Sequence, residues 1–177
     1  LGKDPSELKI VTCHLGNGSS ISAVDGGKVV DTSMGMTPLA GLLMGTRAGD
    51  MDPSIPGYLM QRTGKSAEEI DAILNKKSGL AGVSGVSSDK RDLEAAAESG
   101  NERAILASDM LNYQIKKFVG AYAAAMGGLD CVVFTGGIGE NDAYVRSEVC
   151  KDMEFLGISI DTERNKLRGL DINDLTA

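Results

Sequence analysis

Two glycine-rich stretches that follow apolar runs are the features of this sequence best suited to chemistry. HLGNGSS covers residues 14–20 after a β-branched run, and TGGIGEN covers residues 135–141 after the run LDCVVF. Glycine-rich bends expose unpaired backbone N–H groups, and those at a helix N-terminus also lie at the positive end of the helix dipole, so both bind anions. TGGIGEN has neither the Gly-Lys-Ser/Thr ending of a P-loop nor the Gly-x-Gly-x-x-Gly spacing. The two stretches therefore predict a nucleotide phosphate site of another type.

Each stretch also has a purely structural interpretation. HLGNGSS can be an elaborate hairpin loop, and a single histidine such as His14 is more often a satisfied core residue than a catalyst. The glycines of TGGIGEN can serve only to pack a strand closely against a helix. Under the phosphate interpretation, Gly16 and Gly18 permit close approach of the ligand. The side chains able to donate to phosphate oxygens are then Asn17, Ser19 and Ser20.

Two further segments place charged groups among small residues. Arg47 lies in GTRAGDMD, within a long irregular segment over residues 34–52, and its planar guanidinium can bind a carboxylate or a phosphoryl group. Asp50 and Asp52 can orient that arginine or cap the following helix. SSDKRD, residues 87–92, offers donors and acceptors suited to ribose hydroxyls or a base edge, or else a helix cap with surface charges.

Composition excludes several classes of protein. The net charge is −7, with 18 basic and 25 acidic residues, and no basic stripe is interleaved with aromatic residues, so no nucleic-acid binding is expected. No apolar run approaches the length of a membrane span and the N-terminus does not read as a signal peptide, which predicts no membrane association. Three scattered cysteines indicate reduced thiols in the cytoplasm, and neither a disulfide framework nor a metal site. They are Cys13, Cys131 and Cys150.

The residues that remain favour phosphate handling by backbone amides and a guanidinium group. With one histidine in the chain, no pair of histidines can share the chemistry, and no His/Cys cluster has metal-ligand spacing. In phosphoryl transfer the protein acts mainly by positioning and by neutralising charge, so this set of groups suffices for such a role.

The elements that must position these groups form an α/β pattern. Strands are expected over residues 8–13, 19–25 and 28–33 as an antiparallel meander, over 129–134 as a strand buried on both faces, and over 155–160. Helices are expected over residues 53–62 with Asp52 as cap, 67–77 with a Ser66/Glu69 capping box, from Ser88 or Asp89 to 98, over 101–126, and 143–153 after Asn141 or Asp142. Residues 79–88 are expected to form a glycine-serine loop. The apolar stripe predicted for the long helix is Ile105, Leu106, Met110, Leu111, Ile115, Phe118, Val119 and Tyr122.

Four strings in this order resemble the C-terminal domain of the acetokinase family: HLGNGSS, DTSMGMTPLAGLLMGTRAGDMDP, SSDKRDLE and FTGGIGEN. That family belongs to the actin/hexokinase/Hsp70-like phosphotransferases, and the resemblance runs across almost the whole chain. It implies an α/β fold, a ribonuclease H-like or actin-like ATPase lobe whose mixed sheet is flanked by helices. It also implies that ATP and acetate are interconverted with ADP and acetyl phosphate, with Mg²⁺, by a homodimer that pairs through this domain.

The resemblance assigns roles to individual residues. The loop around the nucleotide phosphates matches His14, Leu15, Gly16, Asn17 and Gly18. The segment that contacts the nucleoside matches Asp89, Lys90 and Arg91. The second nucleotide loop, near the ribose and the α-phosphate, matches Gly137, Ile138, Gly139, Glu140 and Asn141. Arg47 matches the arginine that stabilises the transferring phosphoryl group, and Pro38 matches a wall of the acetate methyl pocket.

The resemblance also implies that parts of the family's active site lie outside this chain. The N-terminal domain of the family supplies a second substrate arginine, a catalytic histidine in a His-Gly-Thr-Ser-His-like string and groups around the metal, and no such string occurs here. An acidic metal-associated residue is expected beyond Ala177, so no residue of this chain is expected to bind the metal. Residues 1–177 are thus expected to be a single C-terminal nucleotide-binding domain, inactive by itself.

Two alternatives remain open at this point. The chain can be a non-catalytic nucleotide-binding or dimerisation module. It can also derive from a propionate or butyrate kinase, because one methylene in an acid pocket changes discrimination by only about 1–3 kcal/mol.

Overall fold

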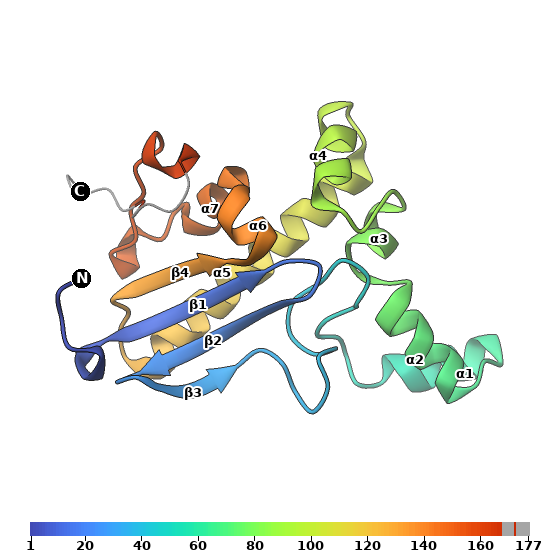
Figure 1. The fold of residues 1–177 in the computed structure, drawn as a ribbon. Coiled ribbons are helices and arrows are strands. Elements are labelled where there is room, and N and C mark those ends of the chain that lie inside the picture. The colour runs from blue at the N-terminus through green and yellow to red at the C-terminus, as the bar shows by residue number, and fades with distance from the viewer. Residues whose placement is uncertain (168–171, 173–177) are drawn as a thin grey trace. The chain divides into compact units, whose positions relative to one another are not determined.

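The structure, a computed structural model, describes residues 1–167 and 172 of the chain (Figure 1). The fold divides into two compact units, one made of Leu1–Ser33 with Asn112–Ala177 and the other of Met34–Leu111. Each unit is described here by itself.

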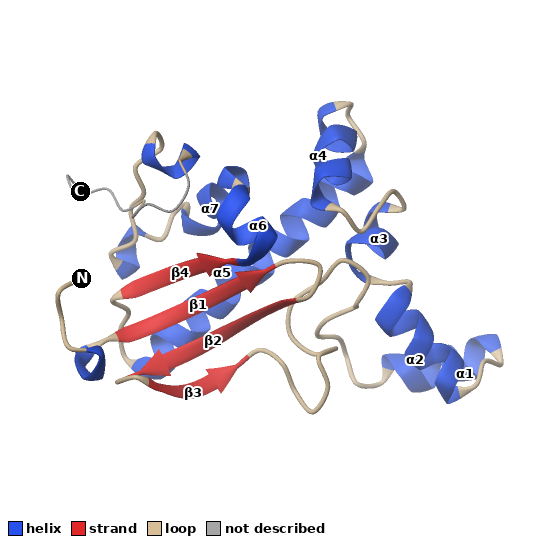
Figure 2. Cartoon of the chain, viewed as in Figure 1, coloured by secondary structure: helices blue, strands red, loops and turns tan. Residues whose placement is uncertain are grey.

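The first unit is built on a four-stranded mixed sheet (Figure 2). Its strands are β1 (Lys9–Leu15), β2 (Ser19–Asp25), β3 (Lys28–Thr32) and β4 (Cys131–Thr135), in the order β3-β2-β1-β4. β1, β2 and β3 pair antiparallel, and β4 pairs parallel to β1. The predicted meander and the mixed sheet are confirmed.

Alternation of side chains gives β1 and β2 one buried face. Val11, Cys13 and Leu15 of β1 are fully buried, as are Ile21 and Ala23 of β2, while the residues between them are more exposed. This period of two is the pattern of a strand with one face in the core.

This unit also contains short helices and 3-10 turns. A short 3-10 turn at Pro5–Glu7 precedes β1. After β4 come α6 (Gly136–Asn141), α7 (Ala143–Cys150) and two further 3-10 turns at Glu154–Leu156 and Arg164–Lys166. Asp142 caps α7 by accepting a hydrogen bond from Val145 N (2.9 Å), as one of the two predicted caps.

The second unit consists of an irregular segment followed by helices. They are α1 (Ile55–Thr63), α2 (Ala67–Lys76), α3 (Gly79–Ser84), α4 (Lys90–Glu98) and the start of α5 (Glu102–Met126), which continues into the first unit. The capping box of α2 is present, since Ser66 N donates to Glu69 Oε2 (2.8 Å) and Glu69 N donates to Ser66 Oγ (3.3 Å).

Three predictions about helices are wrong in part. Residues 79–84 form α3 where a loop was expected, closed by Gly85 at φ +68°. α1 begins at Ile55 after Ser54, because Asp52 accepts from Ser54 N (2.8 Å) and forms a turn before the helix. α7 ends at Cys150, short of residue 153.

The apolar stripe predicted for α5 is confirmed at Leu111, Ile115, Val119 and Tyr122, which are buried, but it is wrong at the start of the helix. Ile105 and Leu106 are 41% and 52% exposed. The buried face is Ala104, Ala107, Ser108, Leu111, Asn112, Ile115, Val119, Tyr122, Ala123 and Met126. The helical period was predicted correctly. In the first two turns, however, the buried positions hold small residues, whereas the prediction had placed the larger residues Ile105 and Leu106 there.

Two predictions about strands are wrong. β4 is not buried on both faces: its residues are half-buried and Val133 is 39% exposed, since β4 is the last strand in the order described. Residues 155–160 do not form a strand, because Glu154–Leu156 is a 3-10 turn and Ile160 makes only an isolated bridge.

The α2 capping box yields a stability prediction. Ser66→Ala removes the hydroxyl that satisfies Glu69 N, and the free energy of unfolding in urea is expected to fall by about 1 kcal/mol. Glu69→Gln is the matched control, because its amide oxygen still accepts from Ser66 N. Equal losses in the two variants would contradict the assignment.

Candidate functional site

The first glycine-rich bend joins β1 to β2 and is held closed by a buried serine. Ser19 is 2% exposed; its Oγ donates to Gly16 O (3.1 Å) and accepts from Gly16 N (3.3 Å). Ser19 therefore braces the bend and is not the free phosphate donor that the sequence suggested. Asn17 is exposed at the tip, and Gly16 and Gly18 are half-buried on either side of it.

The second glycine-rich stretch begins beside the first because β1 and β4 are parallel neighbours. In their register Cys13 lies opposite Phe134 and His14 lies opposite Thr135, so both strands end at the same edge of the sheet (Figure 1). His14 Nδ1 and Thr135 Oγ1 are 3.1 Å apart across this edge, although the two residues are 121 positions apart in the chain. The carboxyl edge of parallel strands is where α/β proteins bind ligands.

The stretch GGIGEN is a helix, α6, and its glycines have different reasons to be glycine. Gly136 has φ +81°, and a Cβ there would lie 2.6 Å from Leu15 O. A Cβ on the buried Gly139 would lie 3.3 Å from Phe134 C and 3.5 Å from Cys13 O. A Cβ on the exposed Gly137 would meet nothing within 4 Å. The packing interpretation therefore holds for Gly136 and Gly139, while Gly137 leaves open space for a ligand.

The other side chains of α6 bond back to its own backbone. Glu140 Oε1 accepts from Gly136 N (3.2 Å), and Asn141 Nδ2 donates to Gly137 O (2.8 Å). Both side chains lie on the exposed surface, and Ile138 between them and Gly137 is half-buried. The first unit thus brings together the two predicted nucleotide loops, His14–Gly18 and Gly137–Asn141.

In the second unit the structure brings together Arg47 and Pro38. Arg47 Nη1 donates to Pro38 O (3.3 Å) and lies 3.5 Å from Met44 Sδ. Asp50 Oδ1 accepts from Gly41 N (2.7 Å), and Asp50 N donates to Gly41 O (2.8 Å). Asp50 therefore closes the irregular loop on itself, and Arg47 takes its orientation from a backbone carbonyl.

The start of α3 supports the backbone that carries Arg47, a contact that sequence reasoning missed. Leu80 N donates to Met44 O (2.8 Å), and Ser78 N donates to Thr46 O (2.9 Å). Gly79 has φ +64°, and a Cβ there would lie 2.8 Å from Arg47 O and 2.9 Å from Arg47 N. Helix and loop are packed backbone to backbone, so glycine is required. The glycine run at 79–85 was the available signal, but it was interpreted as a loop.

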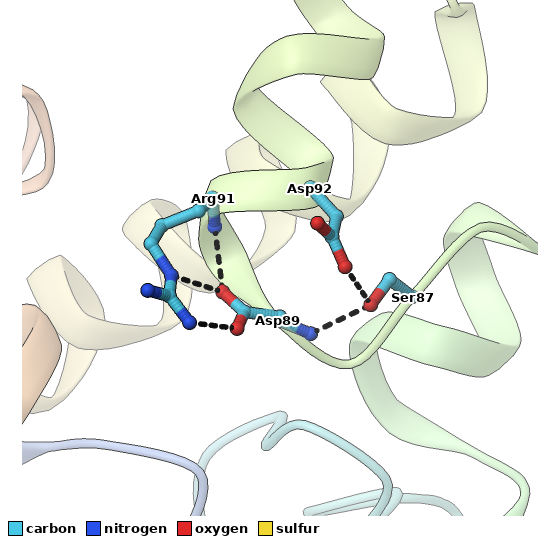
Figure 3. A network of polar contacts seen from close by, with 4 residues as sticks. All are labelled: Ser87, Asp89, Arg91 and Asp92. Carbon is cyan, nitrogen blue, oxygen red and sulfur yellow. Dashed lines mark hydrogen bonds and ion pairs between the residues drawn. The ribbon is translucent and has the colours of Figure 1, made fainter.

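The third predicted segment, SSDKRD, is a helix cap with a charged network (Figure 3). Asp89 Oδ1 accepts from Arg91 N (3.0 Å), and the Arg91 guanidinium donates to both carboxylate oxygens, Nε to Oδ1 (3.0 Å) and Nη2 to Oδ2 (2.6 Å). These bonds lower the pKa of Asp89 to about 2. Ser87 Oγ donates to Asp92 Oδ2 (2.6 Å) and accepts from Asp89 N (3.1 Å). The cap interpretation is confirmed for Asp89.

The neighbouring lysine points away from this exposed network. The side chain of Lys90 is 5% exposed and pairs with Glu94 Oε1 (3.1 Å), whereas the Arg91 side chain is 86% exposed. Within the segment, Lys90 is thus buried, whereas the side chains of Asp89, Arg91 and Asp92 reach the surface.

The described residues contain neither a cluster of metal-ligand side chains nor a helix able to span a membrane. Among them, no group of three or more His, Cys, Asp or Glu side chains is arranged to hold a metal ion. In the same part of the chain, no helix has both the length and the apolar character needed to cross a membrane.

The sheet order β3-β2-β1-β4, with two bends at the shared carboxyl edge of parallel strands, defines a ribonuclease H-like lobe of the actin-like ATPase class. A family model described as the acetokinase family matches residues 1–173, and the chain belongs to that family.

Curated relatives and solved structures agree with this membership. The chain is 59% identical over 169 residues to acetate kinase of Phocaeicola vulgatus, covering 96% of this chain and 42% of that protein. It is 61% identical over 163 residues to acetate kinase of Clostridium botulinum strain Alaska E43, covering 92% and 41%. The crystal structure of Porphyromonas gingivalis acetate kinase superposes with a TM-score of 0.94 at 54% identity, covering 96% of this chain and 43% of that one. A propionate kinase from Francisella tularensis superposes with a TM-score of 0.90 at 44% identity, covering 95% and 44%.

The chain spans about two fifths of the length of the curated relatives it matches, 42% in the first of them.

The different roles of the α6 glycines can be separated by substitution. Gly136→Ala is expected to lower the free energy of unfolding by more than about 2 kcal/mol, because a left-handed alanine costs about 1–2 kcal/mol and its Cβ also meets Leu15 O. Gly137→Ala is expected to leave stability unchanged or to raise it by about 0.5–1 kcal/mol, as for a helical glycine replaced without contact. Urea titrations of both variants measure this, and a comparable loss in Gly137→Ala would show that packing, too, requires that glycine.

Proposed function

We propose that this chain is the C-terminal nucleotide-binding domain of an acetate kinase, which transfers the γ-phosphoryl group of ATP to acetate to give ADP and acetyl phosphate. The observation that supports this most directly is the meeting of the two glycine-rich bends at the carboxyl edge of β1 and β4, with His14 and Thr135 in contact. Membership of the acetokinase family supplies the reaction class.

In this proposal the first unit binds the nucleotide phosphates. Residues 17–18 of the first bend and the open backbone at Gly137 offer amide donors at neighbouring points, and Asn17 adds an exposed side-chain amide. The net charge of the whole chain is −7, so its overall field repels phosphate and the attraction must come from such local donors. His14, Leu15 and Gly18 complete the first loop, and Ile138, Gly139, Glu140 and Asn141 complete the second.

The second unit supplies the charge that stabilises the transferring group. Arg47 is half-buried and anchored through Nη1 to Pro38 O, and a guanidinium has five N–H donors, so donors remain for phosphoryl oxygens. We assign to Pro38 a wall of the acid pocket, and to Asp89, Lys90 and Arg91 the nucleoside. The exposed bidentate pair of Asp89 and Arg91 supports that assignment, whereas the buried ion pair of Lys90 gives it a supporting position.

The Mg²⁺ that the family reaction uses is not assigned to residues of this chain. The described residues contain no group of three or more candidate ligand side chains, so they do not fit a complete metal site. We place the ion's protein ligands in the remainder of the full-length enzyme and derive no step through them.

We further propose that the full-length enzyme is a cytoplasmic homodimer. The three cysteines are free, which agrees with a reducing compartment. α5 exposes Ile105 and Leu106, 41% and 52% accessible, and such apolar residues can contribute to a dimer face.

Light scattering of the full-length enzyme measures its mass, and Leu106→Glu is expected to shift that mass toward the monomer.

The acid substrate has one competing assignment. The similarity to a propionate kinase structure at 44% identity makes propionate the second candidate. Comparing kcat/KM for acetate, propionate and butyrate in the full-length enzyme decides between them, and we expect the highest value for acetate.

Arg47 gives the activity prediction. In the full-length enzyme Arg47→Ala is expected to lower kcat by about 10²–10³-fold, the usual cost of removing one charge-stabilising group. Arg62→Ala is the matched control, because Arg62 lies over the exposed Tyr58 ring on α1, 5.7 Å from its centroid, and is expected to leave kcat unchanged. Similar values for both variants would remove Arg47 from the mechanism.

The isolated chain is expected to bind nucleotide without catalysis. Phosphoryl transfer needs donor and acceptor held in line and shielded from water, which this domain alone does not provide. Calorimetry with ATP should detect binding, while acetyl phosphate formation should not exceed the blank with Arg47→Ala. Binding without activity in the full-length protein as well would favour the non-catalytic module.

A further inference from the structure

A buried arginine that the proposed reaction does not use lies directly behind the second nucleotide loop. Arg146 is in α7, and it is 5% exposed. Arginine is almost never fully buried unless its charge is paired and its donors are bonded, because removing the cation from water costs several kcal/mol. Burial lowers the pKa of Arg146, in keeping with that cost. A buried guanidinium such as that of Arg146 therefore needs hydrogen-bond acceptors for its N–H groups.

The partners of Arg146 are backbone and amide oxygens on two segments. Nη1 donates to Gly139 O of α6 (2.8 Å), Nε donates to Asn165 Oδ1 (2.8 Å), and Nη2 donates to Asn165 O. Asn165 is 3% exposed, and its Nδ2 donates to Ala143 O at the start of α7 (2.8 Å). One buried network thus joins α6, α7 and the turn at Arg164–Lys166.

The carbonyl that Arg146 binds belongs to α6, a helix too short to be stable without tertiary contacts. α6 has six residues, far fewer than an isolated helix needs, and the last four carbonyls of any helix have no partner within it. Gly139 is pressed on one side against Phe134 and Cys13, where a Cβ would come within 3.3–3.5 Å. On the other side its carbonyl is held by Arg146. Gly139 is therefore fixed between the sheet and the guanidinium.

We propose that Arg146 is a positioning residue for the nucleotide: by holding Gly139 O, it keeps α6, and with it the open backbone at Gly137, against the carboxyl edge of β1 and β4. Asn165 orients the guanidinium for that contact. This inference rests on the proposed function, in which Gly137–Asn141 contact the ribose and the α-phosphate. Arg146 itself touches no substrate and acts only through Gly139.

The alternative interpretation is that Arg146 serves only to attach the turn at Arg164–Lys166 to α7. Such an attachment would affect stability, but it would not distinguish the nucleotide from the acid. A positioning role changes the affinity for ATP and leaves the acid pocket, to which we assign Pro38, unchanged. The ratio of the two KM effects therefore separates the interpretations.

The test uses Arg146→Lys in the full-length enzyme. Lysine keeps the charge but has a single ammonium, so it cannot bond Gly139 O and both Asn165 oxygens with the planar fork of arginine. We expect KM for ATP to rise about tenfold and KM for acetate to change less than twofold. Lys166→Gln is the control, since Lys166 is 63% exposed and adjacent to Asn165, and it should change neither constant.

A second variant and a second measurement test the proposal if Arg146→Lys fails to fold. Asn165→Leu keeps the number and branching of the side-chain heavy atoms but removes the Oδ1 acceptor and the Nδ2 donor, and it should also raise KM for ATP. If the two losses act through one network, the double variant should be no worse than the larger single effect. Hydrogen exchange should accelerate at amides 136–141 in both variants and not in β1. Unchanged KM for ATP with a lowered Tm would overturn the proposal.

The proposed function can fail separately. If the wild-type enzyme forms no acetyl phosphate, the kinase assignment is wrong, and the Kd for ADP from calorimetry then decides the positioning role. A Kd that Arg146→Lys leaves unchanged, or no nucleotide binding by the wild type, would overturn it.

Discussion

The parallel pairing of β1 with β4 is the constraint on which the candidate site depends. It joins residues 121 positions apart, and its register sets His14 opposite Thr135, so the bend after β1 and the start of α6 share one edge of the sheet. An antiparallel β4 would send α6 to the opposite end of the sheet. A left-handed Gly136 then turns the chain sharply over Leu15 O, with no room for a side chain. Strand direction and one glycine together determine where the proposed phosphate site lies.

The glycines at these bends differ in what surrounds them, and the residue type alone does not reveal the difference. Gly79, Gly136 and Gly139 are required because backbone packs against backbone there, whereas Gly137 faces open space. A cluster of glycines in a sequence therefore indicates close approach but not whether the approaching group is protein or ligand. Here Gly136 packs against protein backbone, whereas the adjacent Gly137 of the same six-residue helix has open space beside it.

Local patterns predicted much of the fold, and the errors have physical causes. β2 was predicted residue for residue because its alternation is strict, and the α2 capping box because its two hydrogen bonds are local. The start of the α5 stripe was misplaced because the small residues Ala104 and Ala107 are buried there, which side-chain size alone does not reveal. α3 was missed because its glycines lower helix propensity, while its stability comes from tertiary bonds to the loop of Arg47. Long-range contacts of this kind have no signature in a short window of sequence.

Three arginines bind backbone carbonyls of an irregular loop or of the short helices α3 and α6. Arg47 binds Pro38 O, Arg103 binds Gly82 O and Val83 O, and Arg146 binds Gly139 O. Each uses a rigid fork of donors on carbonyl groups, a task that a single ammonium performs poorly. Their burial differs: Arg146 is buried and donates to protein oxygens through Nε, Nη1 and Nη2, whereas the half-buried Arg47 donates to Pro38 O through Nη1. Under the proposed function, Arg47 thus supplies a local positive charge in a chain whose net charge is −7.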